Sequence, residues 1–222
     1  MNLISTVRCL AVFGLAISVS TAFPSPDVSA VAAAVDHRYN YLRSLQTEFT
    51  EIYSGAGMER TESGTLQLKK PGKMRWEYRS PREKLFVSDG HNVWFYVPGE
   101  NQARRSEVKK LDDLRSPLAF LLGKTKLEKE LQGLSAAPDV KPLAAGNVVL
   151  RGVPRGMAGR ISQVLLEITP ENWIRRIVME EADGSTTEYR FSAEQEDTAI
   201  ADRQFQFLVP AGVEVIEESF GQ

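Results

Sequence analysis

Hydrophobic and polar residues alternate along much of this chain, which is the pattern expected of β-strands that place one face on a core. The alternation is clearest in residues 64–98, where four short segments are separated by Pro71-Gly72, Ser80-Pro81 and Asp89-Gly90. Residues of these types are typical of tight turns. The stretch therefore predicts a meander of antiparallel strands, around which the rest of the chain is organised.

The meander carries more apolar surface than one small core uses, because both faces of its last segment, residues 92–97, are apolar. An ordinary core on a curled sheet is one explanation. A cavity for an apolar ligand is the other. We expect this cavity to be lined by eight residues of the meander: Leu66, Leu68, Met74, Trp76, Tyr78, Phe86, Trp94 and Tyr96.

Lys70 ends the strand that carries Leu66 and Leu68, and it lies on the same face as these two leucines. Its ammonium can reach water beyond the strand. Alternatively, it faces the mouth of the cavity and donates to free carbonyls at the C-terminal end of a short helix. In that case Lys70 is a weak latch for a lid.

Two helical regions interrupt the strand pattern. Apolar residues at three- and four-residue spacing predict an amphipathic helix over residues 28–42, capped by Asp27 or Ser25. A helical insertion is expected at about residues 109–134.

Within this insertion, residues 117–122 are apolar on all sides and must be covered on both sides. A second, polar helix is expected at residues 124–132, followed by a loop over residues 135–145. We expect the first of these helices to be a mobile lid of the cavity, through Leu118, Phe120, Leu121 and Leu122.

Further strands are expected on both sides of the insertion. They cover residues 45–53 and 102–107 before it, and residues 147–153, 160–169, 173–181, 186–192 and 204–209 after it. Ten or eleven sequential strands joined by short turns favour a mainly β fold in which one antiparallel sheet curls.

The first 22 residues have the pattern of a secretory signal peptide. Arg8 is their only charge, residues 10–19 are apolar, and Ser20-Thr21-Ala22 supplies the small residues of a cleavage site. The apolar run is shorter than the roughly 20 residues of a membrane-spanning helix. We therefore expect an exported protein in which residues 23–222 form a single soluble domain.

Composition excludes several classes of function. Cys9 is the only cysteine and lies in the expected signal peptide, which excludes disulfides and thiolate metal sites from the mature chain. Without Arg8, 26 basic residues remain against 29 acidic ones, a net charge of −3. Such a charge does not attract the whole protein to nucleic acid or to anionic lipid.

Reactive side chains are few. His37 is on the polar side of the first predicted helix and His91 is in a tight turn, so no Ser-His-acid set can be nominated. Two histidines without cysteine do not suggest a zinc site. We expect no enzymatic activity, no metal and no cofactor.

Several segments resemble the periplasmic outer-membrane lipoprotein carrier family. Apart from a signal peptide without a lipid-attachment site, they are residues 64–72, 75–78, 87–90, 93–96 and 205–215. The similarity is dense over residues 64–98, recurs at the C-terminus and is loose between residues 104 and 147.

The resemblance implies an open, incomplete antiparallel β-barrel whose concave apolar face is covered by an α-helical lid. It implies a periplasmic chaperone that takes the acyl chains of lipoproteins from an inner-membrane releasing transporter and passes them to an outer-membrane receptor. The latch of this family is usually an arginine, and the matching residue is Lys70, which lacks the planar fork of arginine. An acyl chain of about sixteen carbons costs on the order of 12 kcal/mol in water, at ~0.8 kcal/mol per methylene, so a carrier is needed.

Three alternatives stay open at this point. The same scaffold could carry a glycolipid, a phospholipid or another apolar molecule, which the bound cargo would reveal. An exported hydrolase would need a competent histidine or carboxylate pair in a cleft. A structural or adhesive role is the third alternative, and the helical insertion argues against it.

Overall fold

Strands dominate the structure, as the alternating pattern predicts. The computed structural model describes residues 27–108, 126–157 and 159–217. Its strands are β1 (Ser44–Gly55), β2 (Met58–Lys69), β3 (Lys73–Ser80), β4 (Lys84–Asp89), β5 (Asn92–Tyr96), β6 (Gln102–Glu107), β7 (Leu131–Ala136), β8 (Val148–Pro154), β9 (Ile161–Ile168), β10 (Ile174–Glu181), β11 (Thr186–Glu196) and β12 (Glu214–Glu217). The helical elements are α1 (Val28–Tyr41), α2 (Leu127–Glu130) and the short 3₁₀ helix η3 (Asp202–Phe205).

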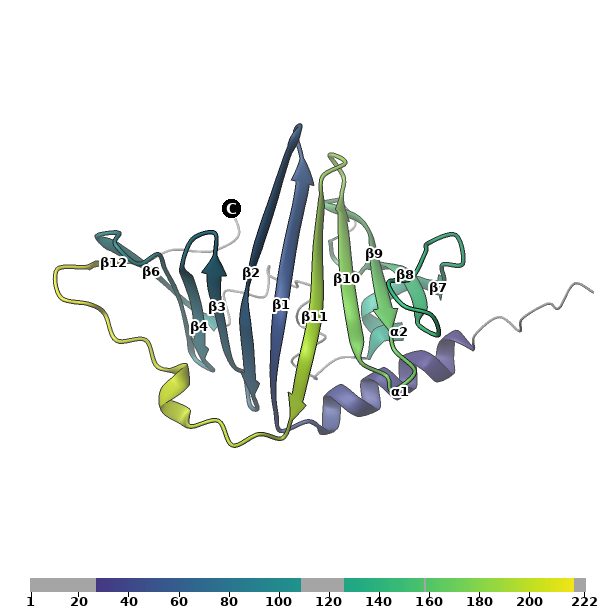
Figure 1. Cartoon of the computed structure of the whole chain (residues 1–222), viewed down its shortest axis with the longest axis horizontal. Coiled ribbons are helices and arrows are strands. Elements are labelled where there is room, and N and C mark those ends of the chain that lie inside the picture. The colour runs from purple at the N-terminus through teal and green to yellow at the C-terminus, as the bar shows by residue number, and fades with distance from the viewer. Residues whose placement is uncertain (1–26, 109–125, 158, 218–222) are drawn as a thin grey trace, which may run out of the picture.

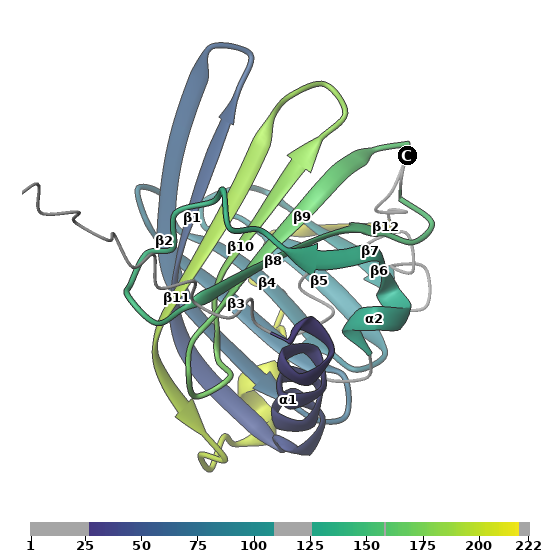
Figure 2. The ribbon, with the colours of Figure 1, turned by 90° about the vertical axis from the view of Figure 1, so that its right-hand side faces the viewer.

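All the described strands belong to one open sheet of twelve strands, in the order β12-β6-β5-β4-β3-β2-β1-β11-β10-β9-β8-β7 (Figure 1). The sheet curls, so that β7 and β8 lie in front of β4 to β6 in the side view of Figure 2. Neighbouring strands are antiparallel except β12, which pairs with β6 in parallel. The mainly β, incomplete barrel is confirmed, with one parallel edge strand that the sequence pattern did not predict.

Helix α1 lies across one end of the concave face, near the lower ends of β8 to β11 in Figure 1. Asp27 caps it as predicted, since its carboxylate accepts a hydrogen bond from the Ala30 backbone N–H. Its apolar face buries Ala32, Val35 and Tyr39 in the main core of the sheet. The helix is therefore held mainly by tertiary packing, which is usual for a helix of this length.

The main core lies between the concave face and α1. It joins α1 residues to inward-facing residues of β1, β2, β3 and β8 to β11. A second, smaller core lies on the opposite face, where Ala137, Val149, Leu165 and Val178 pack together. The chain between β7 and β8 covers that second core, with Leu143 donating its backbone N–H to the buried carboxylate of Glu167.

Two predictions around the insertion are wrong. The polar helix expected at residues 124–132 is described only from residue 126, and it is reduced to α2, four residues long. Leu131 already belongs to β7, where it pairs with Pro154 of β8, and Gly133 has a positive φ of 67° within a register shift of this strand. Pairing with β8 replaces the helical hydrogen bonds, so β7 also occupies the first two residues of the predicted loop over residues 135–145.

The strand predicted at residues 204–209 is also wrong. Residues 202–205 form η3, and residues 206–213 have no regular structure before β12. Phe205 and Phe207 do alternate, but neither belongs to a strand ladder. Phe205, in η3, is 1% exposed, and Phe207 packs its ring on Trp94 and Tyr96. The alternation of apolar residues here therefore does not reflect strand pairing.

Residues 1–22 and 109–125 lie outside the described part of the chain, and so do the expected signal peptide and the expected lid residues Leu118, Phe120, Leu121 and Leu122. Within the described ranges, no helix is both long and apolar enough to cross a membrane.

Candidate functional site

The concave face of the sheet is lined by aromatic side chains from neighbouring strands. Phe49 of β1 contacts Trp76 and Tyr78 of β3 edge to face, with ring centroids 4.7 and 4.9 Å apart. Trp76 also meets Tyr189 of β11 at 5.6 Å. These contacts follow from strand register, because residues directly opposite one another in antiparallel strands share a face.

Six of the eight residues expected to line a cavity lie on this concave face. Leu66, Leu68 and Trp76 are buried there, and Met74, Tyr78 and Phe86 are partly buried against them. Trp76 pairs with Leu66 on one side and Phe86 on the other, which places all three on the same side of the sheet. These six residues therefore form one continuous apolar patch.

Trp94 and Tyr96 lie on the opposite, convex face, which corrects their assignment to the same cavity. They pair with Val87 and Leu85, whereas Phe95 pairs with Phe86. Both faces of β5 are apolar as the sequence indicates, but the second face is covered by the C-terminal segment of the chain. Phe207 packs on Trp94 and Tyr96, with ring centroids 5.2 and 5.5 Å away.

Phe95 of β5 lies on the concave face together with Val93, and it was not among the residues predicted from the sequence. The register of β4 and β5 would have identified it, because Phe95 lies opposite Phe86, which in turn lies opposite Trp76. That register depends on the turn at Asp89 and Gly90. The pattern alone shows which residues of β5 share a face, and the pairing decides which face is concave.

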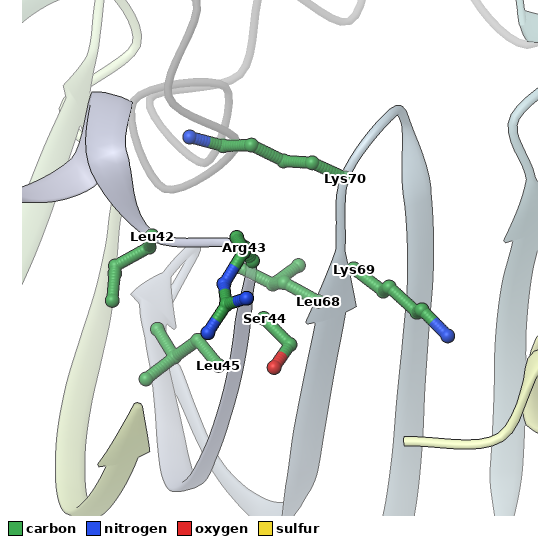
Figure 3. Close-up of a pocket in the computed structure, with 7 residues that line it drawn as sticks. All are labelled: Leu42, Arg43, Ser44, Leu45, Leu68, Lys69 and Lys70. Carbon is green, nitrogen blue, oxygen red and sulfur yellow. The ribbon is translucent and has the colours of Figure 1, made fainter. Parts of the chain in front are cut away.

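Lys70 follows the last residue of β2 and points toward the end of α1 (Figure 3). Its Nζ donates hydrogen bonds to the backbone carbonyls of Tyr39 and Asn40, at 2.6 and 2.7 Å. Carbonyls in the last turn of a helix lack intrahelical partners and carry the negative end of the helix dipole. The Lys70 ammonium therefore holds the C-terminal end of α1.

The geometry expected for a latch is thus present, but its helix is α1. Residues 118–122, which were predicted to be the lid, lie outside the described residues. Removal from water lowers the pKa of Lys70, and the nearby Asp197 carboxylate partly opposes this effect. The contact with α1 is consequently made at some cost in hydration.

A small pocket and an adjoining open groove lie beside Lys70, where α1 leads into β1. The pocket is drawn in Figure 3 with its lining residues, Leu42, Arg43, Ser44, Leu45, Leu68, Lys69 and Lys70. The groove has a volume of about 760 Å³ and is also lined by residues 197–201. Lys69 points away from Lys70 and donates to the Ile200 carbonyl and the Asp202 carboxylate, at 2.6 and 2.7 Å.

Helix α1 also holds the described end of the insertion. The backbone N–H of Leu127, the first residue of α2, donates to the Asp36 carboxylate at 3.0 Å. Ser29 donates its hydroxyl proton to Glu128 at 2.6 Å. Burial raises the pKa of Asp36, while the hydrogen bond from Leu127 opposes that rise. Helix α1 therefore contacts both Lys70 and the root of the insertion.

The end of the concave face away from α1 is polar, which the sequence analysis did not anticipate. Glu51 and Glu62, opposite one another on β1 and β2, are only 8% and 5% exposed. Tyr78 donates its hydroxyl proton to Glu51 at 2.7 Å, and Lys84 donates to Glu62 at 2.5 Å. Both glutamates continue the inward-facing period of their strands, so alternation from Phe49 and Leu66 would have located them.

The two histidines lie apart from this face. His37 is exposed on α1, where its ring is 4.5 Å from that of Tyr41, and His91 is exposed in the turn between β4 and β5. Among the described residues, no group of three or more His, Cys, Asp or Glu side chains could hold a metal ion.

Comparisons with known proteins agree on one family. The family model described as outer membrane lipoprotein carrier protein LolA matches residues 40–208. The chain is 31% identical to an outer-membrane lipoprotein carrier protein of Nitrosospira multiformis, over 79% of this chain and 83% of that protein. It is 30% identical to a protein of the same name from Dechloromonas aromatica, over 90% of this chain and 95% of that one.

A solved structure gives the fold independently. An uncharacterized conserved protein from Thermus thermophilus superposes with a TM-score of 0.56 at 13% identity, covering 87% of this chain and 100% of that one. At this level of identity the likeness concerns the fold alone.

Proposed function

Because the chain belongs to the outer membrane lipoprotein carrier family, we propose that it is a periplasmic chaperone that binds the acyl chains of lipoproteins and carries them to the outer membrane. The observation that carries this proposal is the curled, open sheet with an aromatic and aliphatic concave face and a helix fastened across one end. A carrier needs extensive apolar contacts to cover the chains and few polar contacts to control release. No bond is made or broken in such a cycle.

The proposed binding surface is the set of inward-facing residues around Trp76. Leu66, Leu68, Met74, Tyr78, Phe86 and Phe95 complete it. Each methylene that leaves water gains ~0.8 kcal/mol, so several chains need a large apolar surface but no specific polar contact. Trp94 and Tyr96 are not included, because Phe207 covers them on the convex face.

The proposed cover consists of α1 and the insertion. In the described part, α1 fills one end of the concave face, and the two hydrogen bonds from Lys70 hold its C-terminal end. Residues 118–122 remain candidates for a second part of the cover because they are apolar on all sides. Cargo would displace apolar contacts of the cover and leave Lys70 to set how readily it closes again.

The proposal includes a route. Residues 1–22 would direct export and be removed, leaving residues 23–222 as a soluble periplasmic carrier. Its partners would be acylated lipoproteins, a releasing transporter of the inner membrane and a receptor of the outer membrane. A carrier of another lipid on the same scaffold is the alternative that the following experiment separates.

Purification of the mature protein from the periplasm, followed by mass spectrometry of bound molecules, tests the cargo. We expect triacylated lipoproteins to be recovered, and to be recovered in smaller amounts after Trp76 is changed to Glu, because a charge on this face repels acyl chains. Leu208→Glu, which adds the same charge at a site that is 83% exposed, is the matched control. Recovery of phospholipid or glycolipid without lipoprotein would replace the proposal with the alternative.

A further inference from the structure

We propose that the polar end of the concave face is a subsite for the ester and amide groups that join acyl chains to a polypeptide. It consists of Glu51, Glu62, Lys84, Tyr78 and Tyr189, with Arg60 at its rim. This inference rests on the proposed function and adds to it the orientation of the cargo and the kind of head group that is accepted.

The subsite is a network of buried and partly buried groups, with the exposed Arg60 at its edge. Lys84 bridges Glu62 and the face of Tyr78, with its Nζ 4.2 Å from the ring centroid. Arg60 approaches both glutamates, at 3.3 Å from Glu62 and 4.0 Å from Glu51. The two carboxylates are more than nine-tenths buried, which is costly unless they serve pairing or binding.

The polar network is in direct contact with the apolar part of the concave face. Tyr78 contacts Phe49 by its ring and Glu51 by its hydroxyl, and Tyr189 contacts Trp76. Burial, and then nearby charged or phenolic groups, raise the pKa of both tyrosines, so each keeps its proton. One end of the face is therefore apolar and the other offers hydrogen bonds.

This polarity orients an amphiphile. The apolar end is occupied by α1, whose Ala32, Val35 and Tyr39 are at most 3% exposed. The acyl chains would point toward that end. An ester or amide group buried there would lack a hydrogen-bond partner, which costs free energy, whereas beside Glu51 and Lys84 it has partners. The cargo's chains would thus run from the subsite toward α1.

The charges of the subsite select the head group. Two carboxylates and two cations sum to zero, so the site does not favour an ion of either sign. Hydroxyl and ammonium groups donate to ester and amide carbonyls, and carboxylates accept from amide N–H groups. The groups of the network are paired with one another. A neutral ester or amide junction can exchange hydrogen bonds with them without changing the charge balance, whereas the carboxylate of a free fatty acid adds a third negative charge beside Glu51 and Glu62.

The test compares two probes of equal chain length, a tripalmitoylated cysteinyl peptide and palmitate. Their dissociation constants are measured by displacement of a fluorescent apolar dye from the mature protein. Glu51→Gln leaves a net positive subsite, and the preference for the peptide over palmitate should fall about tenfold, the effect of one charge-assisted hydrogen bond. Lys84→Met leaves a net negative subsite and should raise that preference by a similar factor.

Opposite shifts by the two variants support the subsite, because a loss of packing would weaken both probes alike. Glu188→Gln makes the same chemical change as Glu51→Gln, but on the convex face of the neighbouring strand β11, and should leave the preference unchanged. An unaltered preference in both Glu51→Gln and Lys84→Met, with both probes still bound, overturns the inference alone. Failure of the wild-type protein to bind the peptide overturns the proposed function instead.

Discussion

At the scale of single residues, this protein uses lysines at the end of β2 to hold two different segments. Lys70 points to the concave side and binds carbonyls of α1, while Lys69 points to the convex side and binds Asp202. Adjacent residues of a strand face opposite sides of a sheet, so Lys69 and Lys70 together hold one segment on each side. The two contacts make separate predictions.

Lys70→Leu should free the C-terminal end of α1. Two hydrogen bonds from an ammonium to helix carbonyls are lost, and we expect the free energy of unfolding to fall by roughly 1 kcal/mol because solvent replaces part of them. Hydrogen exchange of the last α1 amides should accelerate, and release of bound lipoprotein should change while uptake is kept. Lys70→Arg should restore both properties; unchanged exchange and delivery in Lys70→Leu would show that Lys70 is no latch.

Asp202 should titrate at unusually low pH. Hydrogen bonds from Lys69 and then Lys73 lower the pKa of its carboxyl from 3.8 to about 2. A lowered pKa means that the contact is fully formed above pH 4 and is lost as the pH falls through about 2. The carboxyl carbon shift in NMR should report this midpoint, and Lys73→Met should raise it toward 3.8. A midpoint near 3.8 in the wild-type protein would mean that the bridge does not form.

At the scale of elements, one segment packs on each side of the sheet and stabilises it. Helix α1 lies against the concave face, and the segment from η3 to β12 runs along the convex face to the edge strand β6, as the yellow end of the chain shows in Figure 1. Helix α1 and residues 202–213, the part of the C-terminal segment before β12, are held by side-chain contacts rather than by a ladder of backbone hydrogen bonds. Single substitutions should therefore loosen them selectively.

Tyr39→Phe tests how α1 is held in the core. The Tyr39 hydroxyl oxygen accepts a hydrogen bond from the backbone N–H of Ile174 at 3.1 Å, and the residue is 3% exposed. Loss of the oxygen leaves a buried donor unpaired, at a cost of about 1–3 kcal/mol in urea unfolding. Tyr41→Phe is the matched control on the same helix, because Tyr41 is 74% exposed. Equal stability of the two variants would contradict the anchoring role of Tyr39.

Phe207→Ala tests the brace on the convex face. The substitution removes ring contacts with Trp94 and Tyr96 and should lower the free energy of unfolding by about 1–2 kcal/mol. Trp94 should become more exposed, and its fluorescence should shift to longer wavelength in a variant without the other two tryptophans. Leu208→Ala, at a site 83% exposed, should do neither. Without a shift in Trp94 emission, the segment is held by other contacts.

At the scale of the whole molecule, cargo can reach the concave face of the open sheet in two ways. Either α1 moves away from the concave face, or the sheet itself spreads. The contacts favour movement of α1, because it is held by packing and by separate hydrogen bonds that involve side chains such as Lys70 and Tyr39, whereas each strand pair is held by a continuous backbone ladder. Cargo needs to disrupt fewer hydrogen bonds to displace the helix.

Spin labels distinguish these two ways. Labels at Ala33 of α1 and Arg190 of β11, both exposed, report the distance from helix to sheet. We expect this distance to lengthen and broaden when lipoprotein binds. The control pair, Arg79 and Arg190, lies within the sheet and should keep its distance. The opposite pattern, a constant helix distance and a longer sheet distance, would show that the sheet spreads.

The sequence by itself determined most of the local structure. Alternation and turn residues located β1 to β6 and β8 to β11, and spacing and Asp27 located α1, because these features depend on neighbours within a few positions of the chain. The same alternation placed six concave-face residues together. It also placed Lys70 facing inward at the end of its strand.

Only the tertiary structure decided what each face meets. Strand period shows that Trp94 and Phe95 face opposite sides, but β4–β5 register and the covering segment with Phe207 assign them to the convex and concave sides. Lys70 reaches α1, about 30 positions away in the chain. Residues 204–209 alternate like a strand yet find no ladder. Pairings between distant segments depend on packing of the whole chain, which local periodicity does not encode.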